Sequence, residues 1–209
     1  MSKAICIAGE SGSGKTTAFR TLPPNETYYI DCDKKGLSWK GWRTQYNKEN
    51  KNYKATDDAK KIQMILAGID KNCPNIHYVV IDTLNGIMVA DEMRRIKEKG
   101  YDKWIDLASC VWDLVDGSYS YRDDLTIIFT AHTQTERDDS GYIKTNGKKL
   151  EKIVLESKFT TVLMAKVVNG KYVLETRSNN STCKTPLGAF EEETIDNDIM
   201  LVINALKDY

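Results

Sequence analysis

The sequence predicts an α/β fold in which a twisted, mostly parallel sheet is flanked by helices and ends in an antiparallel hairpin at one edge. Three observations predict it. Apolar runs of strand length alternate with stretches of helical periodicity, the order that parallel strands joined by crossover helices require. Several runs are apolar throughout, as in strands covered on both faces. Asn169-Gly170 separates the last two runs, and this dipeptide favours a two-residue hairpin turn.

The first part of the chain predicts two strands and the helix between them. Residues 4–8 form an apolar run that leads into a glycine-rich turn, and a helix is expected from Lys15. Pro23 and Pro24 end that helix, because proline cannot donate a helical hydrogen bond. Residues 27–30 then predict the second strand, since they are aromatic or β-branched.

The rest of the chain continues this alternation. Thr56 is expected to cap a helix that ends before Pro74 and buries one apolar face. That face consists of Ile62, Ile65, Leu66 and Ile69. Residues 78–81 predict a fully buried strand, which two helical stretches follow. The stretches carry Met88, Met93 and Ile96, and then Trp104, Leu107, Ala108, Val111, Trp112 and Val115. The last predicted strands span 125–131, 162–167 and 172–174.

The turn after the first strand is a phosphate-binding loop. It reads Gly-Glu-Ser-Gly-Ser-Gly-Lys-Thr and satisfies the pattern G-x-x-x-x-G-K-[ST] in full. Its glycines let backbone N–H groups surround a polyphosphate, and the following helix adds its positive dipole end. Lys15 is expected to contact the β- and γ-phosphates and Thr16 to hold Mg²⁺. The expected nucleotide-binding residues are Gly9, Glu10, Ser11, Gly12, Ser13, Gly14, Lys15, Thr16 and Thr17.

Asp82, directly after the strand over 78–81, is the second chemical feature. A carboxylate at that strand tip can hold Mg²⁺ next to Thr16, which gives the metal ligands Thr16 and Asp82. The alternative is that Asp82 only caps the next turn. Thr83 follows it, where many ATPases carry a glutamate that activates water, so the base must come from elsewhere.

Composition and charge narrow the possible classes. The chain has 209 residues, enough for one sizeable core, and we expect a single domain over residues 1–209. Its 30 basic and 30 acidic side chains balance, so any nucleic-acid surface must be local. It shows neither a signal peptide nor a run of roughly 18 apolar residues, which predicts a cytoplasmic protein without membrane contact. The 5 cysteines lack zinc or redox spacing, so reduced thiols are expected.

With these motifs the chain resembles the RecA-like P-loop ATPases, and more closely the small phage single-strand annealing ATPases of the Sak group, which are AAA-type phage nucleotide-binding proteins. The resemblance covers nearly the whole chain, and the phosphate loop is its most specific motif. It includes the ending of the phage group, matched here by residues 184–190 and by Asn197-Asp198. It implies a RecA-like P-loop NTPase fold that binds ATP and Mg²⁺.

The resemblance also implies a base and a sensor. RecA-like proteins carry the water-activating glutamate in an aromatic-Ile-Asp-x-Glu context, and residues 29–33 match it with Asp33 at the base position. Aspartate there departs from the family pattern. RecA-like proteins also carry a polar sensor residue at the end of the strand that follows the metal-binding carboxylate, and in this chain His132 has that position. The alternative is that His132 is an ordinary residue at a strand end whose polar groups are bonded to the backbone. The implied catalytic residues are Lys15, Asp33, Asp82 and His132.

Two segments are candidates for contacts with single-stranded DNA. RecA-like proteins follow the sensor with a DNA-contacting loop, and residues 133–149 match it in position. This polar segment offers Lys144, Lys148 and Lys149, but acidic neighbours nearly cancel the charge, so a solvated hairpin is the alternative.

The second segment, residues 34–54, has seven basic side chains against the single acidic Glu49, interleaved with tryptophan and tyrosine. Cations that follow phosphates and rings that stack on bases are what sequence-tolerant single-strand binding needs. Lys40, Trp42 and Arg43 are its candidate contacts. The alternative is that the tryptophans anchor the segment on the core while the lysines form its solvated side.

The resemblance further implies a homo-oligomer, a ring or a filament, with nucleotide at the subunit interface. Arg177 and Lys184 are the candidates for a basic residue supplied by the next protomer. The implied function is a DNA-stimulated ATPase that assists annealing or strand exchange in phage-type recombination, inside a bacterial host cell. A single-strand-binding protein is a further expected partner.

Two alternatives to this function share the phosphate loop. One is a small-molecule kinase of the nucleoside monophosphate type, which needs several converging arginines, whereas Arg94-Arg95 is the sole arginine pair in the chain. The other is a nucleotide-gated adaptor such as a helicase loader. ATP is expected over GTP because the chain has no Asn-Lys-x-Asp guanine motif.

Overall fold

The computed structural model describes residues 1–100, 102–135, 141–145, 154–177 and 181–209. Its strands are β1 Lys3–Gly9, β2 Thr27–Asp31, β3 Tyr53–Ala55, β4 Tyr78–Asp82, β5 Thr126–Thr135, β6 Gly141–Ile143, β7 Thr161–Val168, β8 Lys171–Glu175 and β9 Thr194–Asp196. Its α-helices are α1 Trp42–Gln45, α2 Ala59–Asn72, α3 Leu84–Arg94, α4 Asp102–Gly117 and α5 Ile199–Ala205. Two short 3-10 helices are η1 Thr16–Thr21 and η3 Leu155–Lys158.

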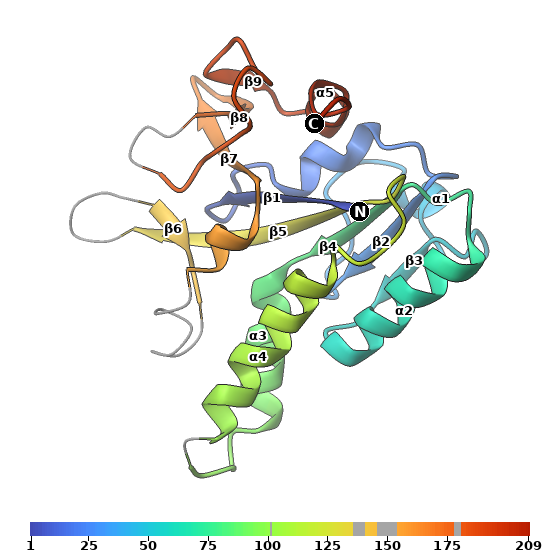
Figure 1. Cartoon of the computed structure of the whole chain (residues 1–209), viewed down its shortest axis with the longest axis vertical. Coiled ribbons are helices and arrows are strands. Elements are labelled where there is room, and N and C mark those ends of the chain that lie inside the picture. Colours follow the sequence, from blue (N-terminus) through green and yellow to red (C-terminus); the bar gives the residue numbers. More distant parts are fainter. Residues whose placement is uncertain (101, 136–140, 146–153, 178–180) are drawn as a thin grey trace.

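The strands of the described residues form one sheet in the order β3-β2-β4-β5-β1-β7-β8-β9, with β6 paired to β5. Every neighbouring pair from β3 to β7 is parallel, and β8 and β9 add antiparallel strands at one edge (Figure 1). The β7–β8 turn is formed by Asn169 and Gly170, both with positive φ, as its hairpin geometry requires. The predicted α/β fold with an antiparallel edge is confirmed.

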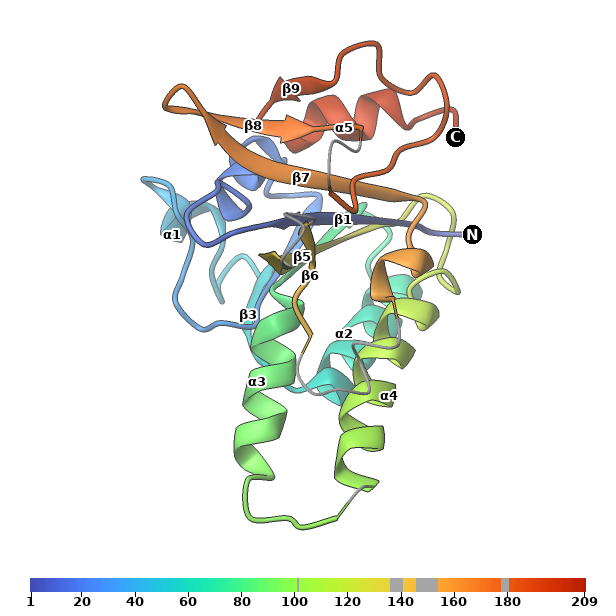
Figure 2. The same ribbon diagram turned by 90° about the vertical axis from the view of Figure 1, so that its left-hand side faces the viewer.

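Helices cover both faces of the sheet. Alternate residues of β1 point to opposite sides: Ala4, Cys6 and Ala8 belong to the core beneath α2, α3 and α4, and Ile5 and Ile7 to the core beneath η1 and α5. In Figure 2, α3 and α4 project from the sheet as an antiparallel pair on one side, and α5 lies on the other. This double covering explains why the central strands read as continuous apolar runs.

Three expectations about local structure need correction. The side chain of Asp58, not Thr56, caps α2, because it accepts hydrogen bonds from the backbone N–H groups of Lys60 and Lys61. The expected helix after the phosphate loop is the six-residue 3-10 helix η1, which ends at Thr21, before the two prolines. The strand expected over 125–131 runs on to Thr135 and pairs antiparallel with β6, as the hairpin alternative for residues 133–149 expected.

All five cysteines are free, as their spacing predicts. Burial raises the pKa of the Cys183 thiol to about 12, so this side chain behaves as an apolar core group. Within the described part of the chain, no helix is both long and apolar enough to span a lipid bilayer.

Candidate functional site

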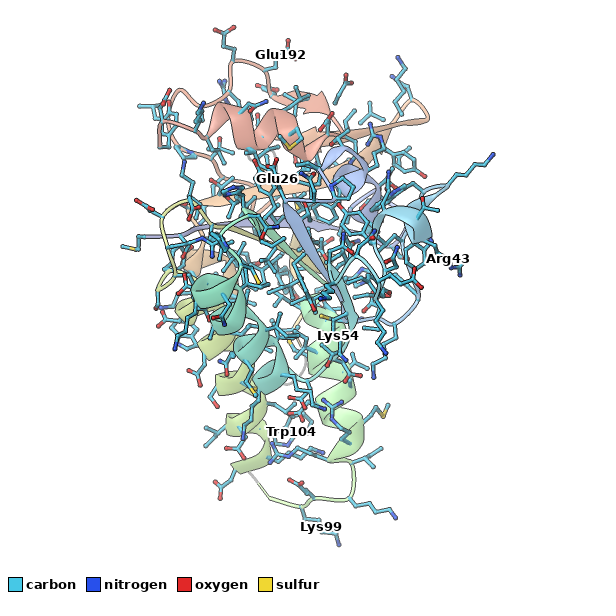
Figure 3. The ribbon with its side chains drawn as sticks, turned by 90° about the vertical axis from the view of Figure 1, so that its right-hand side faces the viewer. Glu26, Arg43, Lys54, Lys99, Trp104 and Glu192 are labelled. Carbon is cyan, nitrogen blue, oxygen red and sulfur yellow. The ribbon has the colours of Figure 1, made fainter. Side chains whose placement is uncertain are left out.

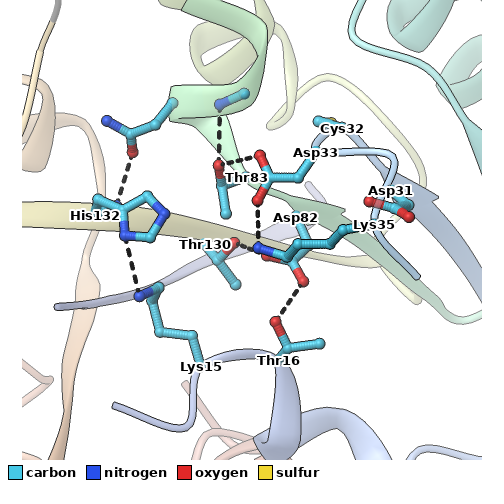
Figure 4. A network of polar contacts seen from close by, with 12 residues as sticks. Lys15, Thr16, Asp31, Cys32, Asp33, Lys35, Asp82, Thr83, Thr130 and His132 are labelled. Atoms are coloured by element: carbon cyan, nitrogen blue, oxygen red, sulfur yellow. Dashed lines mark hydrogen bonds and ion pairs between the residues drawn. The ribbon is translucent and has the colours of Figure 1, made fainter. Parts of the chain in front are cut away.

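The carboxyl ends of β1, β2, β4 and β5 meet at one edge of the sheet, and there the structure gathers the side chains that the sequence singled out (Figure 4). Lys15 follows the phosphate loop after β1, and Asp82 ends β4. Asp33 follows β2, and His132 lies in β5. Because open parallel sheets bind ligands at this edge, the geometry indicates a ligand site.

Close backbone packing fixes the phosphate loop. A Cβ atom on Gly9 would lie 2.6 Å from the Ala165 carbonyl oxygen, and one on Gly14 would lie 2.7 Å from a ring carbon of Tyr172. Gly14 also has a φ of +94°, which strongly favours glycine. The Ser13 hydroxyl in this loop is buried and has no hydrogen-bond partner among the described residues. An orphaned hydroxyl inside a loop of this pattern fits a site for a phosphate oxygen.

Lys15 lies inside the loop. Its ammonium group donates to the carbonyl oxygens of Gly9 at 2.8 Å and Glu10 at 2.6 Å. The residue is only 6% exposed, and burial lowers the pKa of Lys15 to about 8, against the raising effect of the Asp82 charge. Such a lysine is held where phosphate oxygens would bind, rather than in solvent.

His132 faces Lys15. The Lys15 ammonium lies 3.4 Å from His132 Nδ1, and because lysine can only donate, Nδ1 accepts and the ring proton belongs on Nε2. Burial, followed by the charge of Lys15, lowers the pKa of His132, which keeps the imidazole neutral. A neutral ring whose N–H donor has no partner in the described part of the chain suits contact with a phosphate oxygen.

Asp82 accepts hydrogen bonds from three hydroxyl groups on three elements. Its Oδ2 accepts from Thr16 at 2.8 Å and Tyr29 at 2.6 Å, and its Oδ1 accepts from Thr130 at 2.6 Å. Burial and the Asp82 charge raise the pKa of Tyr29 well above its usual value, so the phenol stays protonated and donates. The carboxylate and the Thr16 hydroxyl form an oxygen donor pair that fits Mg²⁺.

Asp33 lies across the site from the loop. Its Oδ2 is 2.6 Å from the Lys35 ammonium, and its Oδ1 accepts from the Thr83 hydroxyl at 3.1 Å. Gly86 makes room for this carboxylate, since a Cβ atom there would lie 2.4 Å from Asp33 Oδ1. The carboxylate therefore sits against the first turn of α3, where the helix dipole favours negative charge.

Asp31, two residues earlier, has a different environment. Its carboxylate accepts from the Gly36 backbone N–H at 2.8 Å and from the Tyr53 hydroxyl at 2.7 Å, and the residue is 2% exposed. These bonds hold the turn after β2. Asp31 is thus a structural partner of its own segment, whereas Asp33 faces the site and is bonded there to Lys35 and Thr83.

Asn85 connects the site to the β5–β6 hairpin. Its side-chain oxygen accepts from the His132 backbone N–H at 2.7 Å, and its amide group donates to the Lys144 carbonyl at 2.7 Å. The Lys144 backbone N–H in turn donates to the His132 carbonyl at 2.7 Å. His132 and Lys144 are therefore joined both directly through their backbones and through the Asn85 side chain, and the Lys144 side chain is exposed. Lys148 and Lys149 lie outside the described residues.

In residues 34–54 the rings pack inward, while Lys40 and Arg43 lie on the surface. Tyr46 is 1% exposed, and its ring centroid lies 5.7 Å from that of Tyr29 in the core. Trp42 packs on Tyr53 at 5.5 Å, with the Arg43 guanidinium 5.0 Å from its ring. Lys40 and Arg43 are exposed, and Figure 3 shows Arg43 at the outer edge of the molecule. The rings thus anchor this segment, as the alternative interpretation expected, while the cations remain available on its surface.

The two candidate trans-acting residues are bonded within their own chain. Arg177 donates to the carbonyl oxygens of Phe190 at 2.7 Å and Glu191 at 3.2 Å. The backbone of Lys184 forms an isolated antiparallel bridge with Val162 in β7. Both residues therefore belong to the antiparallel edge of the sheet, and neither is among the groups that contact the phosphate loop.

Sequence reasoning missed five residues of the site: Tyr29, Lys35, Thr83, Asn85 and Thr130. A signal was present for one of them. Thr130 is a polar residue inside an apolar strand, and a buried hydroxyl needs a partner. Lys35 depends on the conformation of the turn after β2, and the other three depend on which residues of distant elements face one another.

The fold and this arrangement of loop, carboxylates and polar strand end define a P-loop nucleotide-binding protein. Residues 1–184 match the family described as AAA domain, so the chain belongs to that family. Membership indicates nucleotide-binding ATPase activity of the P-loop AAA type. No curated protein matches the chain.

Proposed function

We propose that this protein hydrolyses ATP, binds single-stranded DNA and assists annealing or strand exchange, as the phage annealing ATPases of the Sak group do. The observation that carries the catalytic part is the convergence of Lys15, Asp33, Asp82 and His132 on the phosphate loop. The observation that carries the coupling to DNA is the bonding of His132 to Lys144 through Asn85.

In this proposal each converging residue has one role. Lys15 leaves the loop carbonyl groups and neutralises charge on the β- and γ-phosphates. Thr16 and Asp82 hold Mg²⁺, which when bound offsets phosphate charge. Asp33 orients the attacking water, and the His132 N–H contacts the γ-phosphate. When the γ-phosphate leaves, the change at His132 reaches the hairpin that carries Lys144.

Single-stranded DNA is proposed to contact two exposed basic surfaces. One carries Lys40 and Arg43, and the other carries Lys144; Lys148 and Lys149, which lie outside the described residues, are proposed contacts from the same segment of the sequence. Support for the first is that its cations are exposed while the ring of Trp42 keeps a partly exposed surface. Stacking on Trp42 requires the Arg43 guanidinium to move off the ring.

Oligomerisation and its partners form the last part of the proposal. A homo-oligomer, a ring or a filament, would let Arg177 or Lys184 of one subunit reach the nucleotide of the next. Arg177 would have to exchange its carbonyl partners for the phosphate, a gain because the phosphate is itself charged and can accept a bidentate bond from the guanidinium. A single-strand-binding protein is proposed to present the DNA.

The experiment compares ATP turnover with single-stranded DNA, with a nucleoside monophosphate, and with neither. Stimulation by DNA supports the proposal. Formation of a nucleoside diphosphate from the monophosphate would instead identify a kinase. A specific observation disfavours that outcome: Arg94 is paired with Asp57, and Arg95 with Glu98 and Asp106, so the arginine pair does not converge on the site. ATP binding without turnover in all three assays would identify a nucleotide-gated adaptor.

A further inference from the structure

Lys35 brings a second cation into the site. Its ammonium group lies 2.6 Å from Asp33 Oδ2, and Figure 4 shows its side chain reaching toward Asp33 and Asp82. With the Thr83 hydroxyl on Oδ1, both oxygens of this carboxylate are engaged. The Lys35 ammonium thus occupies one of the lone-pair positions of Oδ2 through which this carboxylate would accept a proton from water.

The neighbouring Lys34 shows that this contact is specific to the site. Lys34 is almost equally exposed, at 52% of its side chain against 54% for Lys35, and it also pairs with an aspartate. Its partner is Asp57, which it shares with Arg94 of α3, away from the phosphate loop. The two lysines thus make equivalent ion pairs, but only that of Lys35 involves a candidate catalytic group.

Electrostatics supports the location of Lys35. Burial lowers the pKa values of Lys15 and His132, and in both the positive charge of Lys35 contributes to the lowering. Partial burial acts to lower the pKa of Lys35, but its hydrogen bond to Asp33 and nearby carboxylates outweigh it, and the pKa is raised. Among the described residues, Lys15 and Lys35 are therefore the charged cations that act on this site.

We propose that Lys35 binds the γ-phosphate of ATP and covers Asp33 when no γ-phosphate is present, an inference that rests on the proposed ATPase function. A lysine ammonium on a flexible four-carbon chain can move between two acceptors. The γ-phosphate, with charge spread over its oxygens, attracts Lys35 away from Asp33 Oδ2. ADP offers no such acceptor, so with ADP the Lys35–Asp33 pair remains.

The release of Asp33 Oδ2 then permits hydrolysis. The water oxygen forms a bond to the γ-phosphorus, while the bond from that phosphorus to the βγ-bridging oxygen breaks and leaves its electron pair on ADP. One proton of the water passes to Asp33 and then to the released phosphate. Lys35 thereby links recognition of the γ-phosphate to activation of the water.

The experiment measures binding of Mg-ADP and of a non-hydrolysable Mg-ATP analogue by titration calorimetry. We expect Lys35→Met to weaken binding of the ATP analogue about tenfold or more, the value of one lost charge-assisted hydrogen bond. Binding of ADP should stay within about twofold of wild type, because no contact with it is lost. Lys34→Met, the matched control, should change neither affinity, and Lys35→Arg should restore part of the preference for the analogue.

Two outcomes would overturn the inference. In the first, wild type prefers the ATP analogue to ADP, and Lys35→Met has the same ratio of the two affinities. This result shows that Lys35 only neutralises Asp33, and it leaves the ATPase proposal standing. A wild type that binds neither ligand refutes the ATPase proposal and the inference with it. If Lys35→Met does not fold, the same ratio of affinities is measured in a double variant that carries Lys35→Met and Asp33→Asn. This double variant leaves no unpaired carboxylate in the site.

Discussion

At the strand ends, hydroxyl groups from η1, β2 and β5 donate to one buried carboxylate, Asp82, whereas in residues 34–54 the cations after Lys35 are exposed to solvent beside rings that pack inward. Both regions are rich in polar residues, and both looked functional in the sequence. The difference is convergence. Polar groups from distant elements that meet in a buried place hold one another in fixed geometry, as chemistry requires. Cations of one segment that diverge on a surface suit an extended, charged partner.

The largest effect on ATP turnover is expected from substitutions at the strand ends, where side chains from several elements meet. Lys15→Ala should lower ATP turnover by at least about a hundredfold to a thousandfold, because it removes the charge that faces the β- and γ-phosphates. Asp82→Asn should retain some nucleotide binding and lose Mg²⁺-dependent turnover. Coupled assays of ADP release measure both, and circular dichroism checks that each variant is folded. Turnover that survives in Asp82→Asn would mean that Asp82 only organises its three hydroxyl partners.

A second prediction for the strand ends compares substitutions of Asp33 and of its neighbour Asp31. Asp33→Asn should bind ATP and hydrolyse it about a hundredfold more slowly, because the amide cannot accept a proton. Asp31→Asn is the control: it is buried in its own turn, so it should lower thermal stability and leave kcat close to wild type. Equal losses of kcat in the two variants would contradict the division of roles.

The basic segment should respond to salt in a way that the site does not. Replacing Lys40 and Arg43 by Ala should reduce the slope of log affinity for a labelled oligonucleotide against log salt by about 1.4, or roughly 0.7 for each lost phosphate contact. Trp42→Ala should lower affinity without a change of slope. Fluorescence anisotropy measures both, with Lys144→Ala beside them. Slopes that all equal that of wild type would exclude this surface.

The smallest effect concerns support for Asp82. Tyr29→Phe removes one of three donors to this buried carboxylate, and we expect a loss of about 1.5 kcal/mol in the free energy of unfolding. Urea denaturation measures the loss. Tyr46→Phe is the control, because the partners of its hydroxyl, the Leu22 carbonyl at 3.4 Å and the Thr27 side chain, carry no charge. A larger loss in the control would mean that the aromatic cluster, not the carboxylate, depends on these hydroxyl groups.

Much of this could be predicted from the sequence because it depends on local patterns. The phosphate loop is a contiguous motif, and the continuous apolar run over 78–81 predicts a buried strand. Lys15 and Asp82 could therefore be placed at the same edge of the sheet from topology alone. The hairpin at Asn169-Gly170 followed from backbone conformation. In each case neighbouring residues carry the whole signal.

The rest depends on side chains that meet across the sheet. Tyr29 reads as an ordinary strand residue, and only the parallel pairing of β2 with β4 brings its hydroxyl to Asp82. Lys34 and Lys35 are indistinguishable in the sequence, but the backbone of Lys34 has a φ of 57° and the two side chains reach different aspartates. The cap at Asp58 was missed because Thr56 offered an equally good capping residue nearby.

The most direct test is the rate of ATP turnover while a single-stranded oligonucleotide is titrated at two salt concentrations, with Lys15→Ala as the blank. The account predicts that turnover rises to a plateau, and that the oligonucleotide concentration at half effect increases with salt, since exposed cations bind the DNA. Turnover that is the same with and without the oligonucleotide, at both salt concentrations, would contradict it.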